Sequence, residues 1–260
     1  MLQSLLAVLS SSLVGFALGL IGGGGSIMAT PLLLYVVGLQ PHVAIGTGAV
    51  AVSINAFANF AGHARAGNLR WRDAAIIAAI GMAGALIGSW FGKDFDGQRL
   101  LFLFALLIVA VGVLMLRRGG IKPSSAPAAM PGNPAGCFAR VAVCALGIGL
   151  LSGFFGIGVG FLIVPGLLFS TGMPTLFAVG SSLLAVGTFG LTTAISYASS
   201  GLIDWVVAVE YVAGGLADSY LGMQLACHLG ANKTALNRIS AGLVFVVAFY
   251  MLYRNAPPSG

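Results

Sequence analysis

The chain has 260 residues, of which 58% are hydrophobic and 7% are charged, and its mean hydropathy is +1.02. A soluble domain carries roughly 25% charged residues, so this composition excludes a soluble fold and predicts an all-α polytopic membrane protein. The net charge of +6 would suggest a nucleic-acid partner in a soluble chain. In a membrane protein Lys and Arg are first of all topology signals in short loops, so we expect no nucleic acid.

The first predicted element is an apolar helix over residues 1–21, which ends at the four consecutive glycines 22–25. Four glycines lose on the order of 3 to 4 kcal/mol of helix propensity relative to alanine, so the helix breaks here. The apolar segment 26–38 reaches only about 20 Å as a helix, too short for a hydrocarbon core of about 30 Å. It begins either at Ser26 with a kink at Pro31, or at Thr30 as N-cap with Pro31 as first helical residue.

Three predicted spans complete the first half, and a linker follows. The spans cover residues 43–62, 74–91 and 100–116. The segment after them is rich in Pro, Ser, Ala and Gly, which predicts a flexible linker outside the membrane. The predicted domains are a first transmembrane repeat (1–117), a cytoplasmic linker (118–137) and a second transmembrane repeat (138–260). The three histidines stand at the ends of predicted spans, and we expect their side chains to be solvated or interfacial: His42, His63 and His228.

The second half repeats the plan of the first at a fixed offset of 134 residues, the separation of Gly22 and Gly156. A glycine-rich break at 156–160 precedes a short arm to residue 172, and spans are predicted at 176–197, 205–225 and 235–253. Identical residues recur at this offset in the pairs Gly22/Gly156, Pro31/Pro165, Gly38/Gly172, Ala44/Ala178, Gly46/Gly180, Gly67/Gly201, Trp71/Trp205, Gly81/Gly215 and Gly88/Gly222. This regularity indicates two homologous halves.

The basic residues predict that the two halves are inverted. The loop from Arg65 to Arg72 and the linker are both basic and lie two crossings apart, so both are expected in the cytoplasm. The equivalent loop of the second half, 199–204, has no Lys or Arg. Inversion requires an odd number of crossings in each half, which holds if each Gly-broken unit is a helical hairpin followed by three transmembrane helices. A parallel arrangement would instead place this loop without Lys or Arg in the cytoplasm.

Inverted repeats with broken helices are typical of secondary transporters, whose substrate site lies where the half-helix ends meet. The arm after each glycine break presents unpaired backbone N–H groups and the positive end of its dipole, which favours an anion. The alternative is that the glycines only permit close helix packing. The expected substrate-binding residues are Gly23, Gly24, Gly25, Ser26, Thr47, Asn55, Gly156, Gly158, Gly160, Ser181 and Ser182.

The pattern of a glycine cluster, a Pro, and an Ala-x-Gly-Thr or Ala-x-Gly-Ser element (44–47, 178–181), followed in the second half by a Gly-x-Ile-Asp-Trp turn (201–205), resembles the TauE/SafE family of sulfite exporters and sulfonate permeases. The resemblance covers essentially the whole chain. It implies transport of sulfite, sulfonate, sulfoacetate or a similar small anion across the bacterial inner membrane. The second cluster reads GIGVG where the family more often has GIGGG, so Val159 narrows or stiffens that tip.

Asp218 is the other departure, because it stands where the offset places Gly84 and where family members carry a small residue. A carboxylate within a span is a functional candidate by default, so Asp218 is a candidate for proton coupling, with a structural hydrogen bond to a neighbouring helix as the alternative. The polar residues Asn55, Asn59, Thr188, Thr192 and Thr193 either line the cavity or hydrogen-bond between helices.

Transport has two alternatives, an anion channel and a non-transporting membrane subunit. The sequence contains no HExxH, no paired intramembrane Asp motif and no Ser/His arrangement, and its cysteines have no metal-binding spacing. We therefore expect no enzyme, no catalytic residue, no metal and no cofactor. The expected partners are a small anionic substrate and membrane lipid. The sequence does not decide whether the protein is a monomer or a homodimer.

Overall fold

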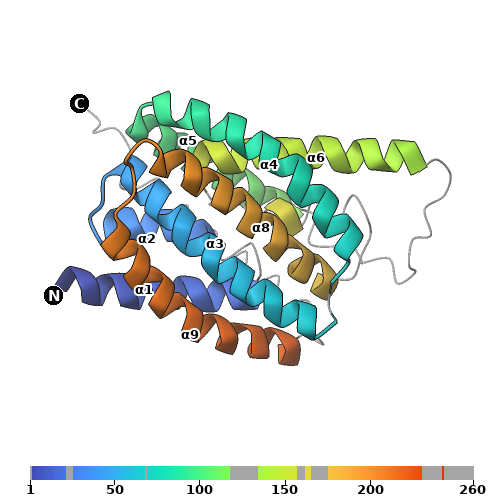
Figure 1. Ribbon diagram of the computed structural model, residues 1–260, viewed down its shortest axis with the longest axis horizontal. Coiled ribbons are helices and arrows are strands. Elements are labelled where there is room, and N and C mark those ends of the chain that lie inside the picture. Colours follow the sequence, from blue (N-terminus) through green and yellow to red (C-terminus); the bar gives the residue numbers. More distant parts are fainter. Residues whose placement is uncertain are drawn as a thin grey trace.

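The computed structural model describes residues 2–21, 26–67, 69–117, 134–156, 162–164, 175–229 and 242, and this part of the chain is helical with no strand (Figure 1). The helices are α1 (Leu2–Ile21), α2 (Ala29–Tyr35), α3 (Pro41–Arg65), α4 (Trp71–Asp94), α5 (Gly97–Arg117), α6 (Pro134–Phe155), α8 (Thr175–Ala198) and α9 (Trp205–Leu229). The predicted all-α class is confirmed. The last predicted span, 235–253, lies outside the described residues.

Within the described residues, three helical segments are long and apolar enough to cross a membrane: Pro41–Arg65, Trp71–Asp94 and Phe177–Ala198. Their outer faces carry exposed large apolar side chains. On α4, for example, Leu86 and Trp90 are exposed, and on α8 Leu191 and Ile195 are exposed. Such a surface suits contact with lipid hydrocarbon rather than water.

The arm after the first glycine break begins in neither of the two expected ways. Residues 26–28 form a 3₁₀ turn, and α2 begins at Ala29 with Met28 at the N-cap position. Pro31 therefore stands in the first turn, where a backbone N–H has no partner within the helix, so the proline neither kinks α2 nor breaks a bond. The second repeat begins earlier than expected, because α6 begins at Pro134 and the last residues of the expected linker (118–137) are helical.

The most extensive helix contacts join the two halves of the chain. α1 packs along α9, and α6 packs along α4. Gly15 lies against Gly215 in the first pair, and Gly149 lies against Gly81 in the second, in each case so closely that an added Cβ would collide with the opposite backbone. The offset of 134 residues carries Gly15 onto Gly149 and Gly81 onto Gly215. The two interhelical contacts are therefore the same contact made twice.

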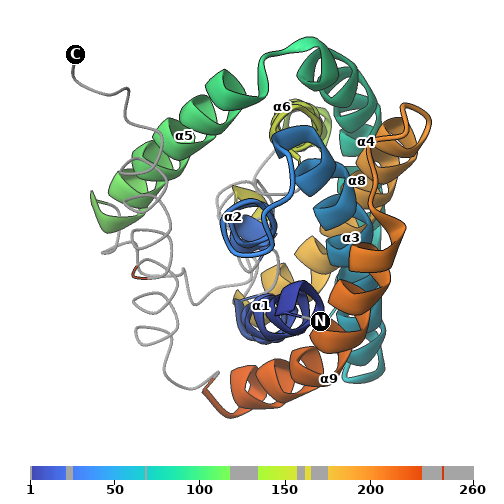
Figure 2. The same ribbon diagram turned by 90° about the vertical axis from the view of Figure 1, so that its left-hand side faces the viewer.

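Helices α3 and α8, which we call the central helix pair because α8 packs on α4 and α3 packs on α9, lie side by side and run in opposite directions. The start of α3 lies beside the end of α8, where the N–H of Asp204 donates to Thr47 Oγ1 at 3.0 Å. The end of α3 lies beside the start of α8, where the N–H of Arg70 donates to Ser181 Oγ at 3.3 Å. Seen from one end, α2 lies in the interior, with α1 and α6 on either side of it (Figure 2).

Candidate functional site

The glycine breaks are only partly within the described residues. Gly23, Gly24, Gly25, Gly158 and Gly160 lie outside them, whereas Ser26 is fully buried and Gly156 closes α6. Gly156 has φ +74°, and a Cβ at this position would stand 2.7 Å from Ile45 Cγ2. Both the backbone conformation and the lack of space therefore require glycine there.

One apolar cluster, which we call the tip cluster, contains residues that flank both breaks together with one face of α5, namely Leu100, Leu101, Phe104, Ala105 and Ile108. Ile27 follows the first break, Phe155 precedes the second, and Leu162 follows it. Ile45 of α3 and Tyr197 of α8 complete its contacts with the central helix pair. The ends of the two Gly-broken units are thus packed through a common set of side chains.

Thr47 and Ser181, which the repeat relates to each other, make equivalent hydrogen bonds. Each hydroxyl is buried and accepts the backbone N–H just before a helix of the other half, α9 in one case and α4 in the other. The neighbouring Ser182 is also buried and donates to the carbonyl of Val179 at 2.8 Å. Thr47 and Ser181 therefore each hold the start of a helix of the other half, whereas the bond from Ser182 to Val179 lies within α8.

The polar side chains within α3 and α8 bond mainly to their own helices. Asn59 Nδ2 donates to the carbonyl of Asn55 at 2.9 Å, and Thr192 and Thr193 donate to carbonyls four residues earlier. Such bonds satisfy the hydroxyl without a partner helix. Asn55 differs, because its side chain is buried against Gly215 of α9 and its Oδ1 has no partner in the described part of the chain.

Asp218 makes a contact that its counterpart in the other half cannot make. Ser12 of α1 donates a hydrogen bond from its hydroxyl to Asp218 Oδ2. The equivalent positions are Leu146 and Gly84, where the glycine lies directly against the backbone of α6. The same helix contact is therefore apolar in one half and carries a carboxylate in the other.

Three buried polar side chains were not predicted from the sequence. Tyr197, Tyr211 and His63 are all 0% exposed, and the tyrosine hydroxyl groups and the imidazole nitrogens have no hydrogen-bond partner among the described residues. The expectation that His63 is solvated or interfacial is wrong, because its side chain lies on the buried face of the last turn of α3. The repeat offset, which carries His63 onto Tyr197, was the available signal. No three His, Cys, Asp or Glu side chains gather as metal ligands within the described ranges.

The sequence matches the family model described as sulfite exporter TauE/SafE over residues 7–251. A probable membrane transporter protein of Xylella fastidiosa (strain 9a5c) is 53% identical, over 98% of this chain and 97% of its own length. The probable membrane transporter protein YdhB of Bacillus subtilis is 25% identical, over 84% of this chain and 88% of its own. No solved structure gives a significant match. The chain therefore belongs to the sulfite exporter TauE/SafE family of membrane transporters.

Proposed function

We propose that this protein is a secondary transporter that moves a small anion across the bacterial inner membrane by alternating access. The observation that carries the proposal is the exchange of helices between the halves: α1 pairs with α9, and its repeat counterpart α6 pairs with α4. An exchanged pairing relates the two halves by a pseudo-twofold axis. Transporters of this architecture bind substrate at the interface of the two repeats. They open the binding site to either side of the membrane by rocking one repeat or bundle against the other.

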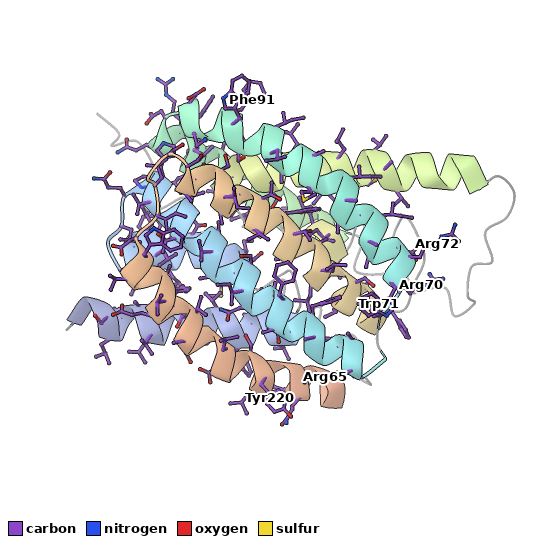
Figure 3. All side chains as sticks on the ribbon, in the orientation of Figure 1. Arg65, Arg70, Trp71, Arg72, Phe91 and Tyr220 are labelled. Atoms are coloured by element: carbon purple, nitrogen blue, oxygen red, sulfur yellow. The ribbon has the colours of Figure 1, made fainter. Side chains whose placement is uncertain are left out.

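The helix directions support inverted repeats, each a Gly-broken hairpin plus three transmembrane helices. Equivalent helices α3 and α8 run in opposite directions, as the bonds at Thr47 and Ser181 require. The side chains of Arg65, Arg70 and Arg72 all lie at one end of the bundle, around the turn between α3 and α4 (Figure 3). Because basic loops stay in the cytoplasm, we assign this end to the cytoplasmic side of a multi-pass protein.

The proposed substrate is sulfite, a sulfonate, sulfoacetate or a similar anion, bound at the two glycine breaks. The family description supports the class of anion. The tip cluster supports this location for the substrate, because Ile27 beside the first break and Phe155 beside the second belong to the same cluster. Glycines without side chains let an oxyanion reach backbone N–H groups, which bind it without a cationic side chain.

Asp218 is the proposed coupling group. The face of α9 that carries it packs on α1, which has no ionisable side chain, and α3, the other helix in contact with α9, has none between His42 and His63. A carboxylate within a span and without a basic partner on these helices is suited to gain and lose a proton. Its bond to Ser12 connects it to α1, the helix that leads into the first glycine break. Protonation there would act on the arm that holds the substrate.

Flux into proteoliposomes tests the function. We expect labelled sulfite or sulfoacetate to accumulate under a pH gradient in vesicles that contain the protein, and not in empty vesicles. Gly24→Val and Gly158→Val should abolish the flux in folded protein, because a side chain then blocks access to the backbone. A large flux that ignores the gradient would indicate a channel instead. No flux of any tested anion would indicate a non-transporting subunit.

A further inference from the structure

A lysine in the last turn of α4 bonds to the end of α8. Lys93 Nζ donates hydrogen bonds to the carbonyl of Ser196 and to Ser200 Oγ, both at 3.0 Å. The ion pairs of Arg70 and Arg99 are local, because each joins a carboxylate three residues away in the chain. Lys93 instead reaches residues 103 and 107 positions later, in the other half. These bonds therefore fasten one half of the molecule to the other.

Helices α4 and α8 run side by side in the same direction and end together. The ring of Phe189 lies so close to Gly81 that a Cβ on this glycine would collide with it, and further along both helices Lys93 meets Ser196. Two helices that run in the same direction place the negative ends of their dipoles together. The ammonium group of Lys93 lies where both helices end, so its charge favours the contact.

The carbonyl of Ser196 needs partners from outside its helix. It lies in the last turn of α8, where carbonyl groups lack the N–H partner that a longer helix would supply. The N–H of Ser200 bonds to the carbonyl of Tyr197 instead. The Ser196 carbonyl accepts the hydroxyl of Ser199 at 2.8 Å and the ammonium group of Lys93. A charged donor to such a carbonyl contributes more to stability than a neutral one.

The other half has no lysine at the equivalent position. Asn55 of α3 lies against Gly215 of α9. The offset of 134 residues relates this pair to Phe189 and Gly81, so the contact of α9 with α3 repeats the contact of α4 with α8. The same offset places Cys227 at the position of the lysine. A thiol has no positive charge and is a weak donor, so only one of the two equivalent contacts has an ammonium group at this position.

Helix α4 carries α6 with it, because Gly88 and Gly92 lie directly against the backbone of α6. Lys93 therefore holds a pair of helices, and not one helix alone, against α8. The bonds lie at the end of α4, opposite the basic turn at which this helix begins. In the proposed topology this is the periplasmic end of the bundle.

We propose that Lys93 is a latch that closes the contact between α4 and α8 at this end and must release before the transporter opens there. This inference rests on the proposed alternating access and adds a device that controls it. The bonds of a latch favour the state in which they form. Because the equivalent contact at the opposite end has no lysine, the resting protein opens at that opposite end.

Modification of a buried cysteine tests the latch in the purified protein. In a background without the three native cysteines, the probe is Thr193→Cys. Thr193 is 0% exposed and lies one helical turn beyond Phe189, on the face of α8 that packs on α4. A small thiol reagent reaches this position when α4 and α8 part. Lys93→Met should raise the rate of modification at least about threefold, since opening no longer breaks a charged hydrogen bond.

Two controls separate a latch from general loosening. Arg99→Gln removes a positive charge at the same end, where Arg99 pairs with the nearby Asp96, and it should leave the rate at position 193 unchanged. A cysteine in place of Asn59, the repeat counterpart of Thr193 on α3, is also buried. It should react equally slowly with and without Lys93→Met.

The latch is wrong if Lys93→Met leaves the rate at position 193 unchanged, or if it raises the rates at positions 193 and 59 alike. These measurements need no substrate. A rise at position 193 alone, in a protein without any anion flux in proteoliposomes, would reject the proposed function and leave the release of α4 from α8 established.

Discussion

At the scale of single residues, two buried hydroxyl groups join the halves of the molecule. Thr47 and Ser181 were expected to bind substrate, and each hydroxyl accepts a backbone N–H of the other half. This could not be predicted, because the bond joins positions far apart in the chain. The error at His63 has the same origin, since its burial depends on which helices cover the last turn of α3.

The replacement Asp218→Asn tests the coupling role at this scale. Asparagine keeps an oxygen that can accept the bond from Ser12, so the contact between α1 and α9 should survive. It cannot gain or lose a proton, so uptake driven by a pH gradient should be lost, while exchange of substrate without a gradient continues. The measurement compares the two fluxes in proteoliposomes over a range of pH.

The control for this variant is Glu210→Gln, which removes the other carboxylate of α9, two turns earlier. It should leave gradient-driven uptake intact. If folded Asp218→Asn keeps the wild-type dependence of uptake on pH, the coupling role is wrong. Asp218 then has only the alternative role, a structural hydrogen bond to a neighbouring helix.

At the scale of helices, the sequence predicted the long helices of the described residues but not where they end or how they pair. The glycine pattern indicated close packing, and Gly81 and Gly215 were already matched by the repeat. Their partners Gly149 and Gly15 come from the opposite half. A repeat in sequence shows that two segments are equivalent. It contains no information on whether equivalent helices pack within one half or across the two.

The variant Gly149→Ala tests the exchanged pairing of α4 and α6. A Cβ at this position would collide with the carbonyl oxygen of Gly81, so the helices must separate. We expect a loss of about 1 to 3 kcal/mol, typical of overpacking. Thermal unfolding in detergent measures it.

Gly147→Ala, on the same helix, provides the control, since nothing lies within 4 Å of its added Cβ. It should be neutral or stabilising by up to about 1 kcal/mol, because alanine favours a helix more than glycine. Equal unfolding temperatures for the two variants would mean that α6 does not pack on α4 as described.

At the scale of the whole molecule, the charge pattern and the helix directions independently support the proposed inverted topology. The charge pattern is a property of loops. The turn after α3 is basic, whereas the turn after α8 has no Lys or Arg. The helix directions follow from hydrogen bonds within the bundle. The bonds at Thr47 and Ser181 place the end of α3 beside the start of α8, so the two turns lie at opposite ends of the central pair.

Single cysteines at Ala66 and Ser200, both exposed in these turns, test the topology. The background lacks the native residues Cys137, Cys144 and Cys227. An impermeant thiol reagent added to intact cells should label the cysteine at position 200 and should reach the one at position 66 only after the membrane is opened. The basic side chains beside Ala66 hold that turn in the cytoplasm, and α8 must cross the membrane before the chain reaches Ser200. If the reagent labels both positions in intact cells, or neither, the two turns lie on one side. The inverted arrangement, and with it alternating access between equivalent halves, would then be wrong.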